Sequence, residues 1–312
     1  MHDADDLLLN PKAIAQNRRR FFFKYMSYET ACIVLQNQTL RWSTPIILND
    51  PFDMNFRLHI DVDFERVKQM ALDQSWNDHF GDNPARPGNN LGELISLARR
   101  KFAQKGISMS REDFGKYFES AIDESLAKVL PGVETAYAEM RPMLDRTKVL
   151  CLATQPDNVL MWSHYALQHT GVVIRLENIP EMNSPYSMAQ EVSYPSAMPR
   201  RMDEQGLANL LSGRGRSDLE ELFGKVVLTK SHHWSYEAEW RIYGGFGRDP
   251  AASFEDLQFG APELESLIFG CRMDDDKRNE LKVAANLINP DVRLWSANPS
   301  KYDFRMEIEE IA

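Results

Sequence analysis

The sequence predicts an α+β protein with a mixed, mainly antiparallel sheet at its core and a block of helices inserted into it. Short apolar or alternating segments bounded by turn residues occur towards both ends of the chain, as is typical of strands. Between them, from about residue 61 to residue 147, charged and apolar residues recur at helical spacing. Strands and helices that are grouped in this way indicate the α+β class, because a parallel α/β sheet needs regular alternation.

The first compact segment is expected over residues 21–53. FFFKY predicts a strand, a helix is expected over about 28–37, and TLRWSTP predicts a second strand before the polar turn LNDPFD. Ser27 is a candidate N-cap, because a serine hydroxyl can accept a hydrogen bond from a free amide of the first helical turn. Ala31, Ile33, Val34 and Leu35 supply an apolar helix face.

The helical block contains four helix-like stretches, FERVKQMALDQ, LGELISLARRKFAQK, REDFGKYFESAIDESLAKVL and VETAYAEMRPML, and is broken at DNPARPGNN. We interpret residues 61–147 as an insertion within a single α+β domain over 20–312, preceded by an N-terminal extension over 1–19. Strands return at VLCLAT, VVIRLE, QEVSYP and EAEWRIYGG, and SDLEELFGKVVLTKS predicts a helix. The tail predicts a strand (LESLIFG), a helix (DDDKRNELKVAANLI) and two further strands (VRLWSA and YDFRMEI).

Composition limits the classes of function. The 36 Lys and Arg against 46 Asp and Glu give a formal charge of −10, which argues against extensive binding to duplex nucleic acid. Three widely spaced cysteines predict neither a disulfide framework nor a cysteine zinc site. The start of the chain does not resemble a secretory signal, and no apolar run approaches the roughly 18 residues that a bilayer requires, so we expect a cytoplasmic protein without a membrane partner.

The sequence lacks the phosphate-binding, dinucleotide-binding, zinc-protease and nucleophile-elbow motifs. Three polar clusters remain as candidates for a site. In the first, Asn49-Asp50-Pro51-Phe52-Asp53, short polar side chains lie on a stiff turn. That turn has two interpretations: a purely structural turn, or a polar loop that faces a cleft.

The second cluster is Met161-Trp162-Ser163-His164-Tyr165, which Asp157 could cap as a short helix before Gly171 reverses the chain. A buried aromatic cluster and the wall of a ring-binding pocket both fit these residues. His164 and His169 lie five residues apart, a poor spacing for two ligands on one helix, so no metal is expected.

The third cluster is Tyr236-Glu237-Ala238-Glu239-Trp240-Arg241. Alternation places Glu239 and Arg241 on one face of a strand, where they could form a structural ion pair. Alternatively, Glu239 is a carboxylate held on a rigid strand, which suits a residue that stabilises positive charge or binds a sugar hydroxyl.

These clusters, together with FKYMSYETACIVLQNQTLRWSTPIILNDPFDMNF, EVSYP and LESLIFGCRMDDDKRNEL, resemble a bacterial and phage family catalogued as domain of unknown function 2971. Their order is also similar to the layout of the ADP-ribosyltransferase fold. That resemblance implies an NAD-binding cleft with Glu239 and Tyr165 as catalytic residues. It also implies that the ligand is contacted by Lys24, Tyr25, Asn49, Asp50, Asp53, Trp162, His164 and Arg241.

The resemblance therefore predicts a transferase that takes NAD as substrate, cleaves its N-glycosidic bond and needs no metal. Glu239 would bond the ribose 2′-hydroxyl, while Lys24 and Arg241 would attract the pyrophosphate. The macromolecular acceptor is left open. Two other classes stay open as well: a non-catalytic recognition or effector module, and a metal-dependent nuclease that uses Asp50, Asp53 and Glu239.

Overall fold

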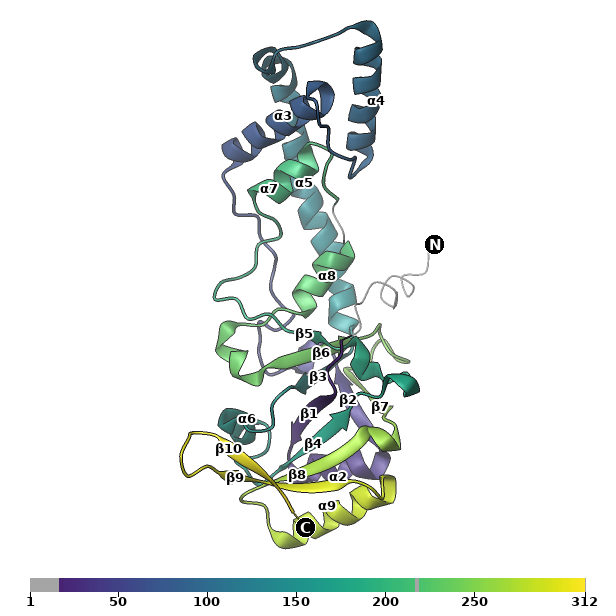
Figure 1. The fold of residues 1–312 in the computed structure, drawn as a ribbon, viewed down its shortest axis with the longest axis vertical. Helices are drawn as coiled ribbons and strands as arrows, with labels where there is room; N and C mark the ends of the chain where they lie inside the picture. The colour runs from purple at the N-terminus through teal and green to yellow at the C-terminus, as the bar shows by residue number, and fades with distance from the viewer. Residues whose placement is uncertain (1–16, 217–218, 312) are drawn as a thin grey trace. The chain divides into compact units, whose positions relative to one another are not determined.

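The computed structural model describes residues 17–216 and 219–311 and divides them into two compact units (Figure 1). The first unit contains the described residues up to Asn55, the segment Met143–Ala197, and the described residues from Lys225 onwards. The second contains Phe56–Pro142 and the described part of Met198–Gly224. The predicted extension over residues 1–19 lies almost wholly outside the described residues, since only residues 17–19 are included.

The described part of the first unit is built on a ten-stranded sheet. Its main path runs in the order β10-β9-β8-β4-β1-β3-β2-β7, and β6 pairs with both β3 and β5. All pairs are antiparallel except the parallel pair of β8 and β9, which α9 (Asp275–Ile288) connects. The predicted α+β class with a mixed, mostly antiparallel sheet is therefore confirmed. The strands are β1 (Phe21–Met26), β2 (Thr39–Ser43), β3 (Val149–Ala153), β4 (Val172–Glu177), β5 (Gln190–Glu191), β6 (Glu239–Tyr243), β7 (Phe254–Gln258), β8 (Leu264–Gly270), β9 (Arg293–Pro299) and β10 (Met306–Glu310).

The two faces of this sheet have different coverings. Residues of α2 (Tyr28–Asn37) and α9 pack with strand residues such as Phe22, Ile174 and Leu267 in the larger apolar core. The short helix α6 (Val159–His164) packs with Phe23, Tyr25 and Val173, which belong to the opposite face because alternate residues of a strand point to opposite sides. Short 3-10 turns complete the unit: η1 (Pro45–Ile47), η2 (Pro180–Met182), η3 (Pro185–Met188), η4 (His232–Glu237) and η5 (Ala261–Glu263).

The sheet is loosely joined between β1 and β3. These strands share a single registered pair, Phe23 with Ala153, whereas β1 is paired with β4 along its whole length. Across the opening, Lys24 Nζ donates a hydrogen bond of 2.7 Å to the Cys151 carbonyl. A side chain thus replaces part of the backbone ladder at this point.

The second unit is helical. It contains α3 (Phe64–Phe80), α4 (Asn90–Lys105), most of α5 (Arg111–Arg146), α7 (Glu204–Leu211) and the first part of α8 (Leu219–Val227). Residues 61–147 are all described and contain no strand, as their periodicity predicted. The unit differs from the predicted segment because α7, which we did not identify in the sequence, shares an apolar core with α3 and α5.

The ends of the helices agree with the sequence in some places and differ in others. Ser27 caps α2 by accepting from the amide of Thr30, as expected. Asp157 does not cap α6, because the side chain of Asn158 accepts from the first amides of that helix instead. The last two helical stretches of the block form one helix, α5, which contains Pro131 and Pro142. Across the described residues, no helix is long and apolar enough to cross a membrane.

Candidate functional site

A cavity of about 160 Å³ lies at the opening between β1 and β3, entirely within the first unit. β1 and β3 form part of its wall through Lys24, Tyr25 and Cys151, and α6 contributes Tyr165 at its C-terminal end. Loop residues that follow β2 and residues at the start of β6 complete it. The polar residues that line it are Lys24, Tyr25, Arg41, Ser43, Asn49, Asp53, Cys151, Tyr165, Lys230, Glu237 and Glu239.

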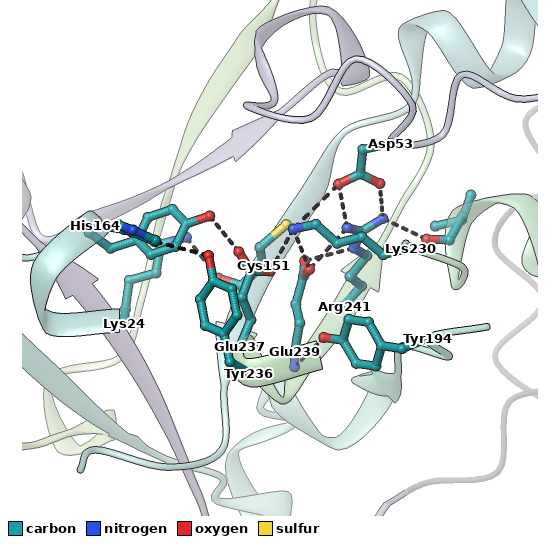
Figure 2. A network of polar contacts seen from close by, with 12 residues as sticks. Lys24, Asp53, Cys151, His164, Tyr194, Lys230, Tyr236, Glu237, Glu239 and Arg241 are labelled. Carbon is teal, nitrogen blue, oxygen red and sulfur yellow. Dashed lines mark hydrogen bonds and ion pairs between the residues drawn. The ribbon is translucent and has the colours of Figure 1, made fainter. Parts of the chain in front are cut away.

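Beneath the cavity, Arg241 is the centre of a buried ionic network (Figure 2). Its Nε and Nη2 donate to the two oxygens of Glu239 at 2.7 and 3.0 Å, and its Nη1 and Nη2 donate to the two oxygens of Asp53 at 2.7 Å each. Nη1 also donates to the Val227 carbonyl at 2.8 Å. The five N–H donors of the guanidinium are therefore all used, which explains how a charged side chain with 0% exposure is tolerated.

A second cation, Lys230, connects the same carboxylates to Glu237. Its Nζ lies 2.5 Å from Glu237 Oε2, 3.2 Å from Glu239 Oε2 and 3.7 Å from Asp53 Oδ2. The Tyr165 hydroxyl donates to the other oxygen of Glu237. We refer to Asp53, Lys230, Glu237, Glu239 and Arg241 as the ionic cluster; it holds three carboxylates and two cations, so its formal charge is −1.

The two glutamates of the ionic cluster have opposite electrostatic environments. Burial disfavours the charge of Glu239, but the positive charges of Arg241 and Lys230 outweigh this effect and hold the pKa of Glu239 well below its usual range. Burial raises the pKa of Glu237, and the negative charge of Glu239 adds to that rise. The cavity wall therefore presents one carboxylate that stays ionised and one that holds a proton more readily.

Cationic side chains also line the cavity. Besides its bond to the Cys151 carbonyl, Lys24 has two further N–H donors. Arg41 binds Asp256 through Nε and Nη2 and lies 3.8 Å from the ring centroid of Phe254. The cavity is thus bordered by both signs of charge, which suits a ligand that is itself dipolar or carries charges of both signs.

The three sequence clusters meet at this cavity, as their interpretation as a single site predicted. Each cluster contributes at least one lining residue: Asn49 and Asp53 from the first, Tyr165 from the second, and Glu239 from the third. Lys24 and Tyr25 line the cavity as well, with the Tyr25 hydroxyl donating to the Gln155 carbonyl at 2.7 Å. Their roles in binding or catalysis stay predictions.

Four residues expected to contact a ligand lie elsewhere. Trp162 is fully buried against Tyr25 and donates its indole N–H to the Pro156 carbonyl, so it is a packing residue and offers no stacking wall. His164 bonds the Tyr236 hydroxyl and is not among the lining residues. Asp50 accepts from the amide of Phe52 within its own turn. The guanidinium of Arg241 uses all its N–H donors in hydrogen bonds to Asp53, Glu239 and the Val227 carbonyl, so none remains for a pyrophosphate.

Five polar lining residues were not identified as site residues: Arg41, Ser43, Cys151, Lys230 and Glu237. Glu237 was inside a recognised cluster, but it ends η4 before the strand begins, so alternation along the strand could not assign it to a face. Lys230 stands in a loop after α8 and has no local pattern that marks it. Its role depends on contacts with chain segments that only the fold brings together.

The nuclease alternative does not fit this geometry. Asp53 and Glu239 do approach each other, but the guanidinium of Arg241 bonds both of them and occupies the place that a cation would need. Lys230 also contacts Asp53 Oδ2 and Glu239 Oε2, which already accept hydrogen bonds from Arg241. Within the described residues, no group of three or more His, Cys, Asp or Glu side chains could hold a metal ion.

Comparison with known proteins finds a family match over part of the chain. Residues 161–242 match the family described as "Protein of unknown function (DUF2971)", so the resemblance expected from the sequence is confirmed over this segment. The segment begins in α6 and ends in β6, and it therefore contains Tyr165, Lys230, Glu237, Glu239 and Arg241. No curated protein matches the chain. No solved structure matches it either.

Proposed function

We propose that the cavity binds the nicotinamide and ribose end of NAD and promotes cleavage of the N-glycosidic bond. The observation that carries the proposal is the charge of the ionic cluster: three buried carboxylates face only two cations beside a cavity. The nicotinamide ring of NAD is positively charged, and the positive charge moves to the ribose as the bond breaks. An excess negative charge at this wall complements both states.

The size of the cavity agrees with partial entry of the dinucleotide. A volume of about 160 Å³ is smaller than the roughly 300 Å³ at which pockets for drug-sized ligands begin. It suits one ring and part of a sugar, with the remainder of the ligand outside. Lys24 and Arg41 line the cavity and supply the positive charges that pyrophosphate oxygens require.

In the proposed reaction, the bond between the ribose C1′ and the nicotinamide nitrogen breaks, and its electron pair leaves with neutral nicotinamide. C1′ gains positive character, which the ionised carboxylate of Glu239 stabilises. A nucleophile then forms a new bond to C1′ and releases its proton. Glu237 is suited to accept that proton because burial raises its pKa, and Tyr165 and Lys230 orient its two oxygens.

A second candidate has its own supporting observation. Both oxygens of Glu239 already accept hydrogen bonds from Arg241, and one also accepts from Lys230. A carboxylate that is satisfied in this way also suits a rigid recognition module that binds its ligand without turnover. This is the non-catalytic class that the sequence left open.

Calorimetric titration with NAD, combined with measurement of nicotinamide release, separates the two candidates. We expect wild-type protein to bind NAD and to release nicotinamide. Glu239→Gln should weaken NAD binding by at most about tenfold, since one negative charge is lost beside the positive ring, and should lower turnover by about a hundredfold or more, the scale on which a preorganised electrostatic group acts. Glu181→Gln is the matched control, because Glu181 is exposed and lies outside the cavity. Binding of NAD without turnover would select the recognition module, and a lack of binding would reject NAD as the ligand.

A further inference from the structure

Arg241 joins the carboxylate of Glu239 to two distant points of the chain. One is Asp53, in the loop after β2, and the other is the carbonyl of Val227, at the end of α8. Asp53 is 188 residues away from Arg241 in sequence. Glu239, by contrast, lies two positions before Arg241 on the same strand face.

The guanidinium holds these groups through its fixed geometry. One edge, Nε and Nη2, meets the two oxygens of Glu239, and the other edge, Nη1 and Nη2, meets the two oxygens of Asp53. Paired contacts of this kind fix the plane of a carboxylate as well as its distance. A lysine at this position would supply charge without the two-edged fork.

Stability alone is a weak explanation for this arrangement. Burying an ion pair costs desolvation energy, and well-packed apolar side chains of similar volume are often at least as stable. Arg241 also cannot contact a ligand, because it is fully buried and does not line the cavity, whereas Glu239 does line it. What the arrangement does fix is the orientation of the Glu239 carboxylate at the cavity wall.

We propose that Arg241 is a positioning residue, which Asp53 and the Val227 carbonyl hold in place so that it fixes the carboxylate of Glu239 at the cavity wall. Asp53 then acts on the reaction through Arg241 and not through the ligand. The inference explains why two clusters so far apart in sequence contain acidic and basic residues that satisfy each other. It rests on the proposed function, in which Glu239 acts on the ribose.

A double-mutant cycle tests this route of action. Arg241→Lys keeps the positive charge and removes the fork, so we expect NAD affinity within about twofold of wild type and turnover lower by tenfold or more, as misplaced catalytic groups show. Combined with Glu239→Gln, the same substitution should cause no further loss, since its effect passes through Glu239. Losses that multiply in the double variant would overturn the proposal.

Asp53→Asn provides a second variant in case Arg241→Lys does not fold. It keeps the side-chain volume and one acceptor but removes the second acceptor that Arg241 uses. We expect lower turnover in the single variant, and again no additional loss when it is combined with Glu239→Gln. A multiplicative loss would show that Asp53 contacts the ligand directly, which would contradict the positioning role.

A titration that needs no activity separates this proposal from the proposed function. The carboxyl carbon of Glu239 can be followed by ¹³C NMR and assigned by its disappearance in Glu239→Gln. In wild type it should stay ionised throughout the acidic range in which the protein is folded, whereas in Arg241→Lys it should begin to titrate at higher pH. If Arg241→Lys leaves this titration and the Glu239 conformation unchanged, the positioning role is wrong whether or not NAD is a substrate. If the titration shifts but no NAD binds, only the proposed function fails.

Discussion

Two buried ionic sites, one in each unit of the chain, differ in their balance of charge. In the helical unit, Arg214 binds Asp78 through two contacts of 2.7 and 2.9 Å, so one cation meets one carboxylate. In the sheet unit, the ionic cluster places three carboxylates around two cations. The Asp78–Arg214 pair is also partly open, with 23% of the Arg214 side chain exposed, whereas Arg241 is fully buried. A pair with equal numbers of positive and negative charges holds two chain segments together. A cluster with more carboxylates than cations beside a cavity also determines the charge that a ligand meets.

The largest difference between the two regions is expected in stability. Arg241→Met leaves Asp53 and Glu239 buried without their main partner, which typically costs about 3–5 kcal/mol of unfolding free energy. Arg214→Met removes a partly exposed cation from a single carboxylate, that of Asp78, and should cost less, about 1–3 kcal/mol. Chemical denaturation of both variants, followed by circular dichroism, measures these costs. Equal losses of unfolding free energy would show that the ionic cluster contributes no more to stability than the Asp78–Arg214 pair.

Enzymatic activity should separate the two regions in the same direction. Arg214→Met changes the helical unit and should leave nicotinamide release per folded molecule within about twofold of wild type. Lys230→Met removes the side chain that donates to Glu237 and orients this carboxylate as the proposed proton acceptor, so we expect turnover to fall by tenfold or more. Initial rates normalised to the folded fraction provide the measurement. A large loss in Arg214→Met would instead assign part of the chemistry to the helical unit.

The two regions should also differ in the pH at which acid begins to lower their stability, although this effect is smaller. His79 lies among the rings of Phe80, Phe102, Phe114 and Phe118, and burial lowers its pKa below the ordinary value of 6.5, with Asp78 and Arg99 acting in opposite directions. The unfolded chain therefore binds a proton on this histidine more readily than the folded chain does. The helical unit should lose stability as the pH falls below about 6.5 and until the folded pKa of His79 is passed.

The pKa of Glu239 is also lowered in the folded protein, but from a lower unfolded value, so its effect on stability appears at lower pH. Its folded pKa is depressed, so its contribution is complete above the unfolded value of 4.5 and is lost only as the pH falls below it. Acid should thus weaken the helical unit before the ionic cluster. Melting curves between pH 7 and pH 4 for wild type and His79→Leu measure the order. An identical pH dependence in the two proteins would exclude His79 as the cause.

The smallest effect is expected at the surface. Arg293 and Glu310 form a two-contact pair between β9 and β10, but both side chains are about half exposed. Exposed pairs of this kind contribute little to stability, because solvent screens the two charges. Glu310→Gln should therefore lower the melting temperature only slightly and leave nicotinamide release unchanged. A loss comparable to that of Arg241→Met would show that burial is not what distinguishes the ionic cluster.

Sequence patterns predicted those parts of the fold that depend on local spacing. The start of α2 follows from a serine cap, and β4 follows from the alternating segment VVIRLE. The shared face of Glu239 and Arg241 follows from alternation along β6. Helix α7 was missed because it is short and its apolar face is explained only by packing against α3. Strand β7 was missed because FEDLQ lacks a buried pattern and forms by pairing with β2.

The candidate site shows the same limit. The three clusters could be identified because each contains an unusual group of polar or aromatic residues, but their mutual contacts could not. Asp53 and Arg241 pair across most of the chain, and no spacing rule connects them. Trp162 was predicted to bind a ligand because tryptophan is amphipathic, but its N–H donates to the backbone carbonyl of Pro156 inside the unit. Burial of that kind is decided by tertiary packing.

The central claim, that the unbalanced ionic cluster prepares the cavity for a positively charged ring, can be tested with two small ligands of the same shape. 1-Methylnicotinamide carries a positive charge, and 3-methylbenzamide is its neutral counterpart. Calorimetric titration should show that the cation binds at least about tenfold more tightly, a difference of about 1.4 kcal/mol. The preference should shrink in Glu239→Gln. Equal affinities, tighter binding of the neutral amide, or a preference that persists unchanged in Glu239→Gln would contradict the account.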